Sequence, residues 1–249
     1  MTKETYPTRR DQITLAVACP MANEGDNASK FVTAVLEQCT GFRSATFFAV
    51  LDRATTDNTR QILDTLAASE PRLKVVWAPE NRCVVDAYVR GYRDSLKSGA
   101  DWVLEIDAGF SHQPTDIPRF FETMAQGYDC VFGSRFMPGG RMTDGSFKRY
   151  VVSRGGTILS NLMLGTRLSD MTSGFELFSS RTLEQVLQRG IQSRAHFFQT
   201  EIKTYCRNLR ITEVPIHYQA PSPRLGSSAL KDSFRQLWRL FRLRLKGQL

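Results

Sequence analysis

Short apolar segments rich in β-branched and aromatic residues alternate with helical patterns along the first half of the chain. The first of these segments is ITLAVAC at residues 13–19, and a helical pattern follows it to about residue 38. Continuous apolar strands joined by helices are typical of parallel sheets that are covered on both faces. The alternation therefore predicts an α/β fold with a mostly parallel sheet and helices on both faces. Further strands are expected at residues 46–52, 73–77, 102–107 and 129–133, and further helices at residues 57–68, 84–98 and 115–126.

The pattern changes after Gly140. The segment FMPGGRMTDGSF at residues 136–147 is rich in glycine and methionine and predicts a mobile loop, and residues 220–228 predict a second one. Helices are expected at residues 148–164, 181–188 and 197–208, strands at residues 174–178 and 211–218, and a last helix at the end of the chain.

The net charge of +8 and the isoelectric point near 9.4 indicate an anionic partner. Anionic lipid and a phosphate-bearing substrate both satisfy this charge, and nucleic acid is not expected because no recognition motif for it is present. No stretch approaches the roughly 18 to 20 apolar residues of a membrane-spanning helix. Five scattered cysteines and no recognisable secretory leader predict a cytoplasmic protein, and peripheral attachment to the cytoplasmic face of the membrane stays open.

Carboxylates follow three of the predicted strands. Glu24 lies after the first strand, Asp52 and Asp57 follow the second, and Asp107 ends the fourth. The carboxyl ends of parallel strands meet at one edge of the sheet, where ligands bind in open α/β folds. Any one of these residues is explained equally well as a helix cap. The set of them favours a ligand site at this edge.

Eight motifs follow one another along the chain: PMANE (20–24), LDRATTDNT (51–59), IDAGFSHQP (106–114), GSRFMPGG (133–140), RYVVSRG (149–155), DMTSGF (170–175), FQTEI (198–202) and EVPI (213–216). The first three resemble motifs of the family-two glycosyltransferases with the GT-A fold, and the resemblance runs from about residue 13 to residue 230. The other five are similar to the polyprenyl- or dolichyl-phosphate mannosyltransferase branch, of the dolichol-phosphate mannose synthase type.

The polar N-terminus predicts a flexible tail at residues 1–12, and the periodicity of the last residues predicts a basic amphipathic helix at residues 231–249. The resemblance implies a GT-A glycosyltransferase domain at residues 13–230. It also implies a nucleotide-sugar donor. The residues expected to bind this donor are Pro20, Asn23, Glu24, Asp52, Asp107 and Arg224, with Asp57 bracing the loop, and Lys231 is the alternative to Arg224. Arg53 stands where the family has a second acidic residue, so base selectivity is open.

The metal motif of the family is reduced to one carboxylate. Two aspartates that flank one residue normally hold Mg²⁺ or Mn²⁺ together with the donor diphosphate. This chain keeps Asp107 as the expected metal ligand but has Gly109 at the second position, and Glu105 is not expected to substitute. Hard divalent cations prefer carboxylate and phosphate oxygens. A Mg²⁺ or Mn²⁺ cofactor is therefore implied with a weaker anchor, and metal dependence stays open.

The resemblance further implies a polyprenyl-phosphate acceptor. Arg135, Arg149 and Ser153 match the acceptor-phosphate positions of the family, and with Asp107 they are the expected catalytic residues. Arginine suits phosphate through bidentate, charge-assisted hydrogen bonds, although Arg149 is also explained as a solvated helix charge. A lipid phosphate is already an anionic nucleophile and needs no general base. Asp170 is therefore expected to organise the acceptor loop.

The last predicted helix is amphipathic. At 100° per residue, one arc carries Phe234, Leu237, Trp238, Phe241 and Leu245, and an adjacent arc carries Lys231, Arg235, Arg239, Arg242 and Lys246. Two interpretations stay open. The helix packs on the core with its basic side chains over the flank, or it lies on an anionic membrane surface, which suits a lipid acceptor.

The leading hypothesis is an inverting hexosyltransferase that moves mannose from GDP-mannose onto a polyprenyl or dolichyl phosphate. Within enzymes, the alternatives are another donor of the UDP-glucose type and a soluble or protein-bound hydroxyl acceptor. A further alternative is a nucleotide-sugar binder without turnover, for which the departures at Arg53, Gly109 and Ala229 are relevant.

Overall fold

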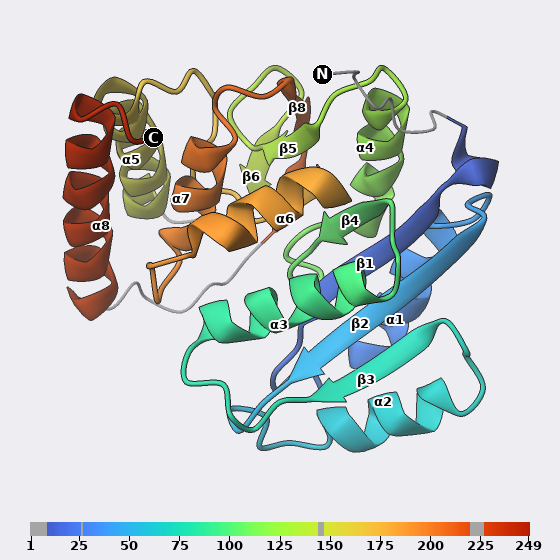
Figure 1. Ribbon diagram of the computed structural model, residues 1–249. Helices are drawn as coiled ribbons and strands as arrows, with labels where there is room; N and C mark the ends of the chain where they lie inside the picture. The colour runs from blue at the N-terminus through green and yellow to red at the C-terminus, as the bar shows by residue number, and fades with distance from the viewer. Residues whose placement is uncertain (1–8, 26, 144–146, 220–226) are drawn as a thin grey trace.

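The computed structural model describes residues 9–25, 27–143, 147–219 and 227–249, and its centre is a seven-stranded sheet between layers of helices (Figure 1). Neighbouring strands are parallel except where β7 is involved, which runs antiparallel to both β4 and β5. The prediction of a mostly parallel α/β sheet is confirmed. In sheet order the strands are β3 (Leu73–Trp77), β2 (Ser44–Leu51), β1 (Thr14–Pro20), β4 (Trp102–Glu105), β7 (Glu176–Ser179), β5 (Cys130–Ser134) and β8 (Ile211–Pro215).

Strand β7 reverses the chain direction inside the sheet. Glu176, its first residue, is the register partner of Glu105, the last residue of β4. The segment 170–175 that leads into β7 therefore reaches the same edge of the sheet as the loops that leave β4 and β5. The apolar pattern predicted this strand but not its direction, because direction is decided by pairing partners far away in the sequence.

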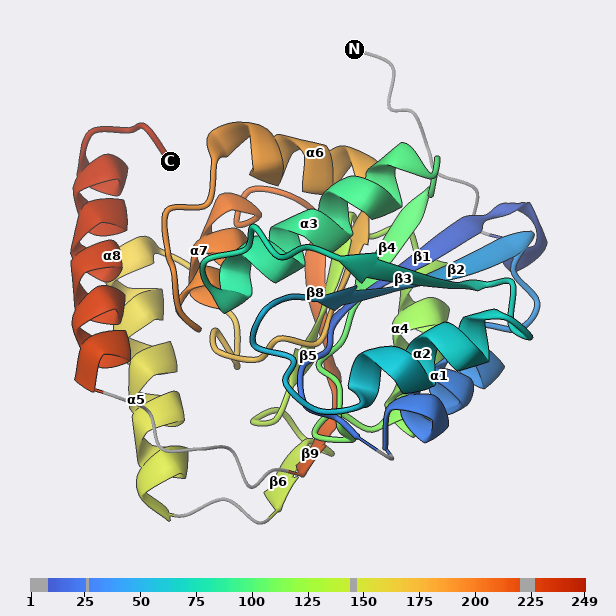
Figure 2. The ribbon, with the colours of Figure 1, turned by 90° about the horizontal axis from the view of Figure 1, so that it is seen from below.

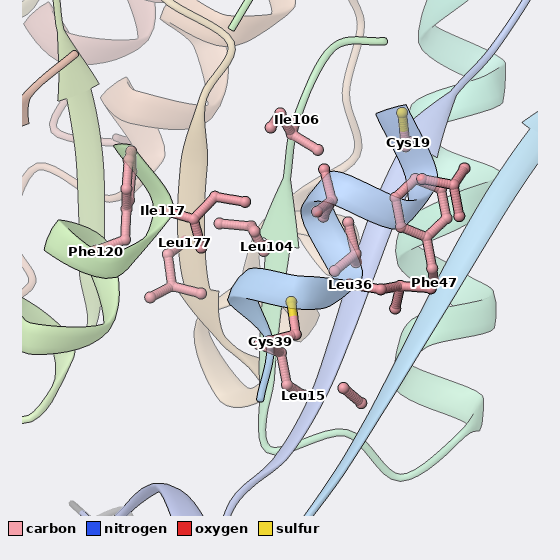
Figure 3. Packing of buried hydrophobic residues seen from close by; sticks show 14 of the residues in the cluster. Leu15, Cys19, Leu36, Cys39, Phe47, Leu104, Ile106, Ile117, Phe120 and Leu177 are labelled. Atoms are coloured by element: carbon pink, nitrogen blue, oxygen red, sulfur yellow. The ribbon is translucent and has the colours of Figure 1, made fainter. Parts of the chain in front are cut away.

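Helices cover both faces of the sheet, as Figure 2 shows. One face carries α1 (Asn27–Gln38), α2 (Thr59–Ala67) and α4 (Ile117–Met124), and the other carries α3 (Val84–Lys97), α6 (Ser180–Arg189) and α7 (Phe198–Tyr205). In the first layer Leu15 and Leu104 of the sheet lie close to Leu36 of α1 (Figure 3). Each such side chain contributes roughly 1.5–3 kcal/mol when it is fully buried. Cys19 of β1 is also buried in this layer.

Helices α5 (Phe147–Leu164) and α8 (Ser227–Leu245) lie side by side at one end of the molecule (Figures 1 and 2). Leu237 and Leu240 of α8 are buried with Leu164 at the end of α5. The guanidinium of Arg244 donates to two carbonyl oxygens in the last turn of α5, at 3.0 and 2.8 Å. None of the helices in the described parts of the chain is both long and apolar enough to cross a membrane.

A small second sheet pairs β6 (Arg141–Thr143) with β9 (His217–Gln219). Strand β6 lies inside the segment 136–147, where a loop was expected, and the expected strand 211–218 is divided into β8 and β9 at Ile216. Two short 3₁₀ helices, η1 (Arg10–Gln12) and η2 (Pro114–Asp116), complete the described structure. The predicted binding residue Arg224 and most of the expected loop at 220–228 lie outside the described residues.

Candidate active site

The carboxyl edge of the sheet opens into a cavity of about 970 Å³. Loops that follow β1, β2 and β4 line one part of it, and α5, α8 and the segment before β7 line another. The structure therefore brings together seven of the residues predicted from the sequence: Pro20, Glu24, Asp52, Asp107, Arg135, Arg149 and Ser153.

Asn23 clamps two loops together. Its side-chain Nδ2 donates to the carbonyl oxygen of Ala54 at 2.8 Å, and its Oδ1 accepts from the backbone N–H of Thr56 at 2.8 Å. Asn23 does not line the cavity, and its backbone has a positive φ of 59°, a conformation that asparagine tolerates better than most residues. The loop after β1 is therefore fixed to the loop after β2 by this side chain.

Asp57 supports the same junction. Its carboxylate accepts the backbone N–H groups of Thr59 and Gly25, each at 3.0 Å. Hydrogen bonds from Thr59 hold the pKa of Asp57 below its ordinary value. The Thr59 hydroxyl in turn accepts the backbone N–H of Glu24 at 2.8 Å. Asp57 thus braces the loop, as the family resemblance implied, and also serves the start of α2.

Asp107 faces the cavity with its side chain one third exposed. The hydroxyl of Tyr88, on α3, donates to Oδ1 and fixes the orientation of the carboxylate. On the other side the Nδ1 atom of His112 lies 3.6 Å from Oδ2 and accepts the backbone N–H of Asp107. Burial lowers the pKa of His112 to about 4, so that its ring is neutral at pH 7. Tyr88 was not predicted from the sequence, although a buried tyrosine usually needs a partner for its hydroxyl.

Glu105 belongs to a separate, fully buried cluster. Tyr92 and Gln199 donate hydrogen bonds to its carboxylate, and Glu176 stands opposite it in the sheet. Burial and the neighbouring Glu176 raise the pKa of Glu105 well above its ordinary value. Burial also raises the pKa of Glu176, to about 7, against the opposing effect of the Lys203 ammonium, whose nitrogen is 3.1 Å away. Glu105 does not line the cavity, so it does not replace the missing metal ligand.

Arg135 is held by a buried ion pair. Its Nε lies 2.7 Å from Oδ2 of Asp170 and its Nη2 lies 2.9 Å from Oδ1, with both side chains almost completely buried. Burial alone would raise the pKa of Asp170, but the guanidinium of Arg135 and the ammonium of Lys203 outweigh it and hold this pKa well below its usual range. Asp170 is therefore a charged partner that fixes Arg135 at the cavity wall.

Tyr218, in β9, brings Arg135 and Arg149 together. The two guanidinium carbons lie 5.3 and 5.4 Å from the centre of its ring, and Arg149 also donates to its hydroxyl at 2.9 Å. Ser153 stands one helical turn after Arg149 on α5 and lines the same cavity. This arrangement concentrates positive charge at one wall and suits a phosphate group. Tyr218 was not predicted from the sequence to have this role.

Hydrogen bonds with side chains of β8 and α7 hold the segment before β7 in place. Glu213 of β8 accepts the backbone N–H groups of Ser169 and Asp170, at 2.7 and 3.0 Å. Lys203 of α7 donates to the carbonyl oxygens of Asp170 and Ser173, at 3.1 and 2.7 Å. The wall that carries Arg135 is therefore preorganised, in keeping with the expectation that Asp170 organises this loop.

Side chains of α5 and α8 line a mostly apolar part of the cavity, which is called the apolar arm below. Val152 and Leu159 of α5 and Leu230, Phe234 and Leu237 of α8 line this arm. Apart from Val84, every exposed large hydrophobic side chain among the described residues belongs to one of these two helices. They are Phe147, Tyr150, Val151, Val152, Ile158, Leu159 and Leu162 of α5, and Leu230, Phe234, Trp238 and Leu245 of α8.

Both interpretations of the α8 sequence have a counterpart in the structure, because the helix has one packed face and one exposed face. One face packs on the protein through Leu237 and Leu240, and the other leaves Phe234, Trp238 and Leu245 more than half exposed. The helix begins at Ser227, before the expected start at Lys231.

Comparisons with known proteins agree with this arrangement. Residues 16–187 match the model of the family described as glycosyl transferase family 2. An undecaprenyl-phosphate mannosyltransferase of Micrococcus luteus is 35% identical over 68% of this chain and 70% of its own length. A polyprenol monophosphomannose synthase of Mycolicibacterium smegmatis is 27% identical over 91% of this chain and 83% of its own length.

Solved structures show the same fold. Glucosyl-3-phosphoglycerate synthase of Mycobacterium tuberculosis, in a complex with Mn²⁺, uridine diphosphate and phosphoglyceric acid, aligns with a TM-score of 0.65 at 16% identity. The alignment covers 93% of this chain and 78% of that one. The same enzyme with Mg²⁺ and uridine diphosphate aligns with a TM-score of 0.63 at 17% identity. The fold is the GT-A fold, as the motifs implied.

Proposed function

Because the chain belongs to glycosyl transferase family 2, we propose that it transfers mannose from GDP-mannose, with inversion, to the phosphate of a polyprenyl lipid. The two curated relatives described above are named for mannosyl transfer of this kind. The observation that carries the proposal is the apolar arm, because it joins a polar, carboxylate-lined part of the cavity to the exposed apolar surface of α5 and α8. A water-soluble acceptor would have no use for such an arm.

The polar part of the cavity is the proposed donor site. Pro20, Glu24, Asp52 and Asp107 bind the nucleotide sugar there. Arg224, which lies outside the described residues, is the further donor-binding residue that the sequence implies. Both the Glu24 and the Asp107 carboxylates line the cavity, so the donor set offers the hard oxygen ligands that Mg²⁺ or Mn²⁺ prefers. Such a cation would neutralise the charge that builds up on the departing diphosphate.

The wall formed by Arg135, Arg149 and Ser153 is the proposed site of the acceptor phosphate. Two guanidinium groups hold the phosphate through charge-assisted hydrogen bonds and aim one of its oxygens at the anomeric carbon. That oxygen forms the new bond from the face opposite the departing nucleoside diphosphate, which gives inversion. The nucleophile is already an anion, so no side chain has to remove a proton, and the neutral His112 is not needed as a base.

The apolar faces of α5 and α8 are the proposed contact with the membrane. Their exposed aromatic and aliphatic side chains would enter the interface, and the exposed Lys231, Arg242 and Lys246 of α8 would face anionic lipid headgroups. Attachment at this face would place the mouth of the apolar arm at the lipid, so that the protein acts as a peripheral protein on the cytoplasmic side of the membrane.

The test is a transfer assay with a panel of radiolabelled nucleotide sugars, polyprenyl phosphate, and Mg²⁺, Mn²⁺ or EDTA. We expect label in the lipid phase with GDP-mannose, and none when the matching polyprenol without phosphate replaces the acceptor. Label from a UDP sugar instead would reassign the donor. Label only in water-soluble products would refute the lipid acceptor, and donor binding without any transfer would refute the activity.

A further inference from the structure

The turn after β4 places Gly109 against the side chain of Glu24. Gly109 has a φ of +77°, a left-handed conformation that most side chains avoid, and Phe110 beside it has a φ of 59°. A Cβ atom at position 109 would lie 2.6 Å from Oε2 of Glu24 and 3.5 Å from Oε1. The glycine that removes one carboxylate from the metal motif is therefore in contact with another carboxylate, supplied by the loop after β1.

The backbone of Glu24 is held while its carboxylate is left for a ligand. Its N–H donates to the hydroxyl of Thr59 at 2.8 Å, and its carbonyl oxygen accepts the N–H of Asn27 at 3.0 Å. None of the described residues donates a hydrogen bond to its carboxylate or forms an ion pair with it, and Glu24 lines the same cavity as Asp107. A carboxylate that only capped α1 would instead accept an N–H group from the first turn of that helix.

We propose that Glu24 and Asp107 together bind the divalent cation, with the Glu24 carboxylate taking the place that an aspartate at position 109 would fill. An aspartate there would carry its carboxylate on a Cβ atom in contact with the present position of Oε2. The glutamate reaches that position from a different loop, because its side chain is one carbon longer and its backbone is pinned nearby. Two carboxylates then share the cation with the donor diphosphate and water.

The inference rests on the donor half of the proposed function, namely a nucleoside diphosphate in the polar part of the cavity. It does not depend on the sugar or on the acceptor. It also predicts that a carboxylate at position 109 can compensate for the loss of the carboxylate at position 24. The second carboxylate can be moved back to position 109 if it is removed from position 24, since aspartate is among the residues that tolerate a positive φ.

The experiment measures Mn²⁺ binding directly, from the electron paramagnetic resonance signal of free Mn²⁺, with the full chain alone and with GDP or UDP. We expect Mn²⁺ to bind in the presence of a nucleoside diphosphate, and Glu24→Gln to weaken this binding at least tenfold. Glu37→Gln is the matched control, because it removes the same charge from an exposed position on α1. Glu24→Ala should weaken binding as much. Adding Gly109→Asp to Glu24→Ala, which lacks the carboxylate atoms that contact position 109, should restore at least half of the lost affinity on a logarithmic scale.

Each outcome decides the inference separately from the function. Binding by Glu24→Gln that equals the wild type, or a loss of the same size in Glu37→Gln, would overturn the role of Glu24. A wild-type chain that binds no Mn²⁺ with either nucleotide would overturn the cation site itself. In both cases the lipid-phase transfer assay, run with Mg²⁺, Mn²⁺ or EDTA, still reports whether the proposed function stands. Circular dichroism of each variant shows that the fold is retained.

Discussion

Helix α8 carries basic side chains next to its exposed aromatic residues, and this arrangement allows the proposed membrane attachment to be tested quantitatively. Lys231, Arg242 and Lys246 are exposed and form no ion pair with the described residues, whereas Arg235 is paired with Asp232 at 2.5 Å. A basic residue near an anionic membrane surface contributes about 1 kcal/mol to binding. Replacing the three by glutamine should therefore weaken binding by about 3 kcal/mol, or roughly a hundredfold in the partition coefficient.

The aromatic residues of α8 supply a second, salt-independent contribution. Phe234 and Trp238 are 63% and 56% exposed. Aromatic side chains of this kind bury 150–250 Å² in all, so each has on the order of 100 Å² left to bury, worth up to about 2.5 kcal/mol. Replacing both by alanine should weaken binding to anionic and zwitterionic vesicles alike, because no charge is removed. Added salt should weaken the wild type only on the anionic vesicles.

The assay is co-sedimentation with vesicles of stated composition, either zwitterionic lipid alone or the same lipid with anionic lipid added. The control replaces three exposed lysines on other elements, Lys30, Lys74 and Lys97, by glutamine, which gives the same change in net charge. Equal losses in the control and in the α8 variant, or no loss in the α8 variant, would refute the assignment of this face. Point substitutions are preferable to deletion of residues 231–249, since deletion would also remove the buried Leu237 and Leu240.

Three further predictions concern the site. Asp107→Asn should abolish lipid-phase transfer with an unchanged circular dichroism spectrum, since asparagine keeps an oxygen for the Tyr88 hydroxyl; substantial activity would remove Asp107 from the mechanism. Asp170→Asn should lower the free energy of unfolding in urea by about 3–5 kcal/mol, because it leaves Arg135 buried without its charged partner, and the double variant Arg135→Met with Asp170→Leu should recover much of this; a loss below about 1 kcal/mol would contradict the reasoning. The pKa of His112 is about 4 in the folded protein and near 6.5 in the unfolded chain, so the unfolded chain binds the extra proton and stability falls as the pH drops from 6.5 to 4. The wild type should lose about 3 kcal/mol relative to His112→Gln over this window, and parallel pH profiles of the two would disprove it.

Local patterns were sufficient for the elements of the fold but not for all of their pairings. The strand at residues 73–77 was predicted with its observed bounds, because a short run rich in β-branched and aromatic residues between turn residues is typical of a strand. The antiparallel direction of β7 depends on its neighbours β4 and β5, and the pairing of β6 with β9 joins residues that are far apart in the sequence. Neither the direction of β7 nor the pairing of β6 with β9 can be predicted from a local pattern of apolar residues.

The strand-end rule located the site because loops at the carboxyl edge of a parallel sheet must meet. It could not separate residues that line the cavity from residues that brace it, and Asn23 was assigned to the first group although its side chain joins two loops. Tyr88 and Tyr218 were missed, since the position of a hydroxyl group depends on tertiary packing. The sequence also showed that Gly109 removes a carboxylate, but not that Glu24 stands beside it.

The apolar arm between α5 and α8 also determines what controls the rate of the proposed reaction. The nucleotide sugar would arrive from water, whereas the lipid would arrive by diffusion in the plane of the bilayer and enter through the arm. Turnover should then follow the mole fraction of acceptor in the membrane rather than its amount per volume of solution. Adding inert lipid at constant acceptor would slow the enzyme by surface dilution, so its Michaelis constant for the acceptor is expressed in mole per cent of lipid.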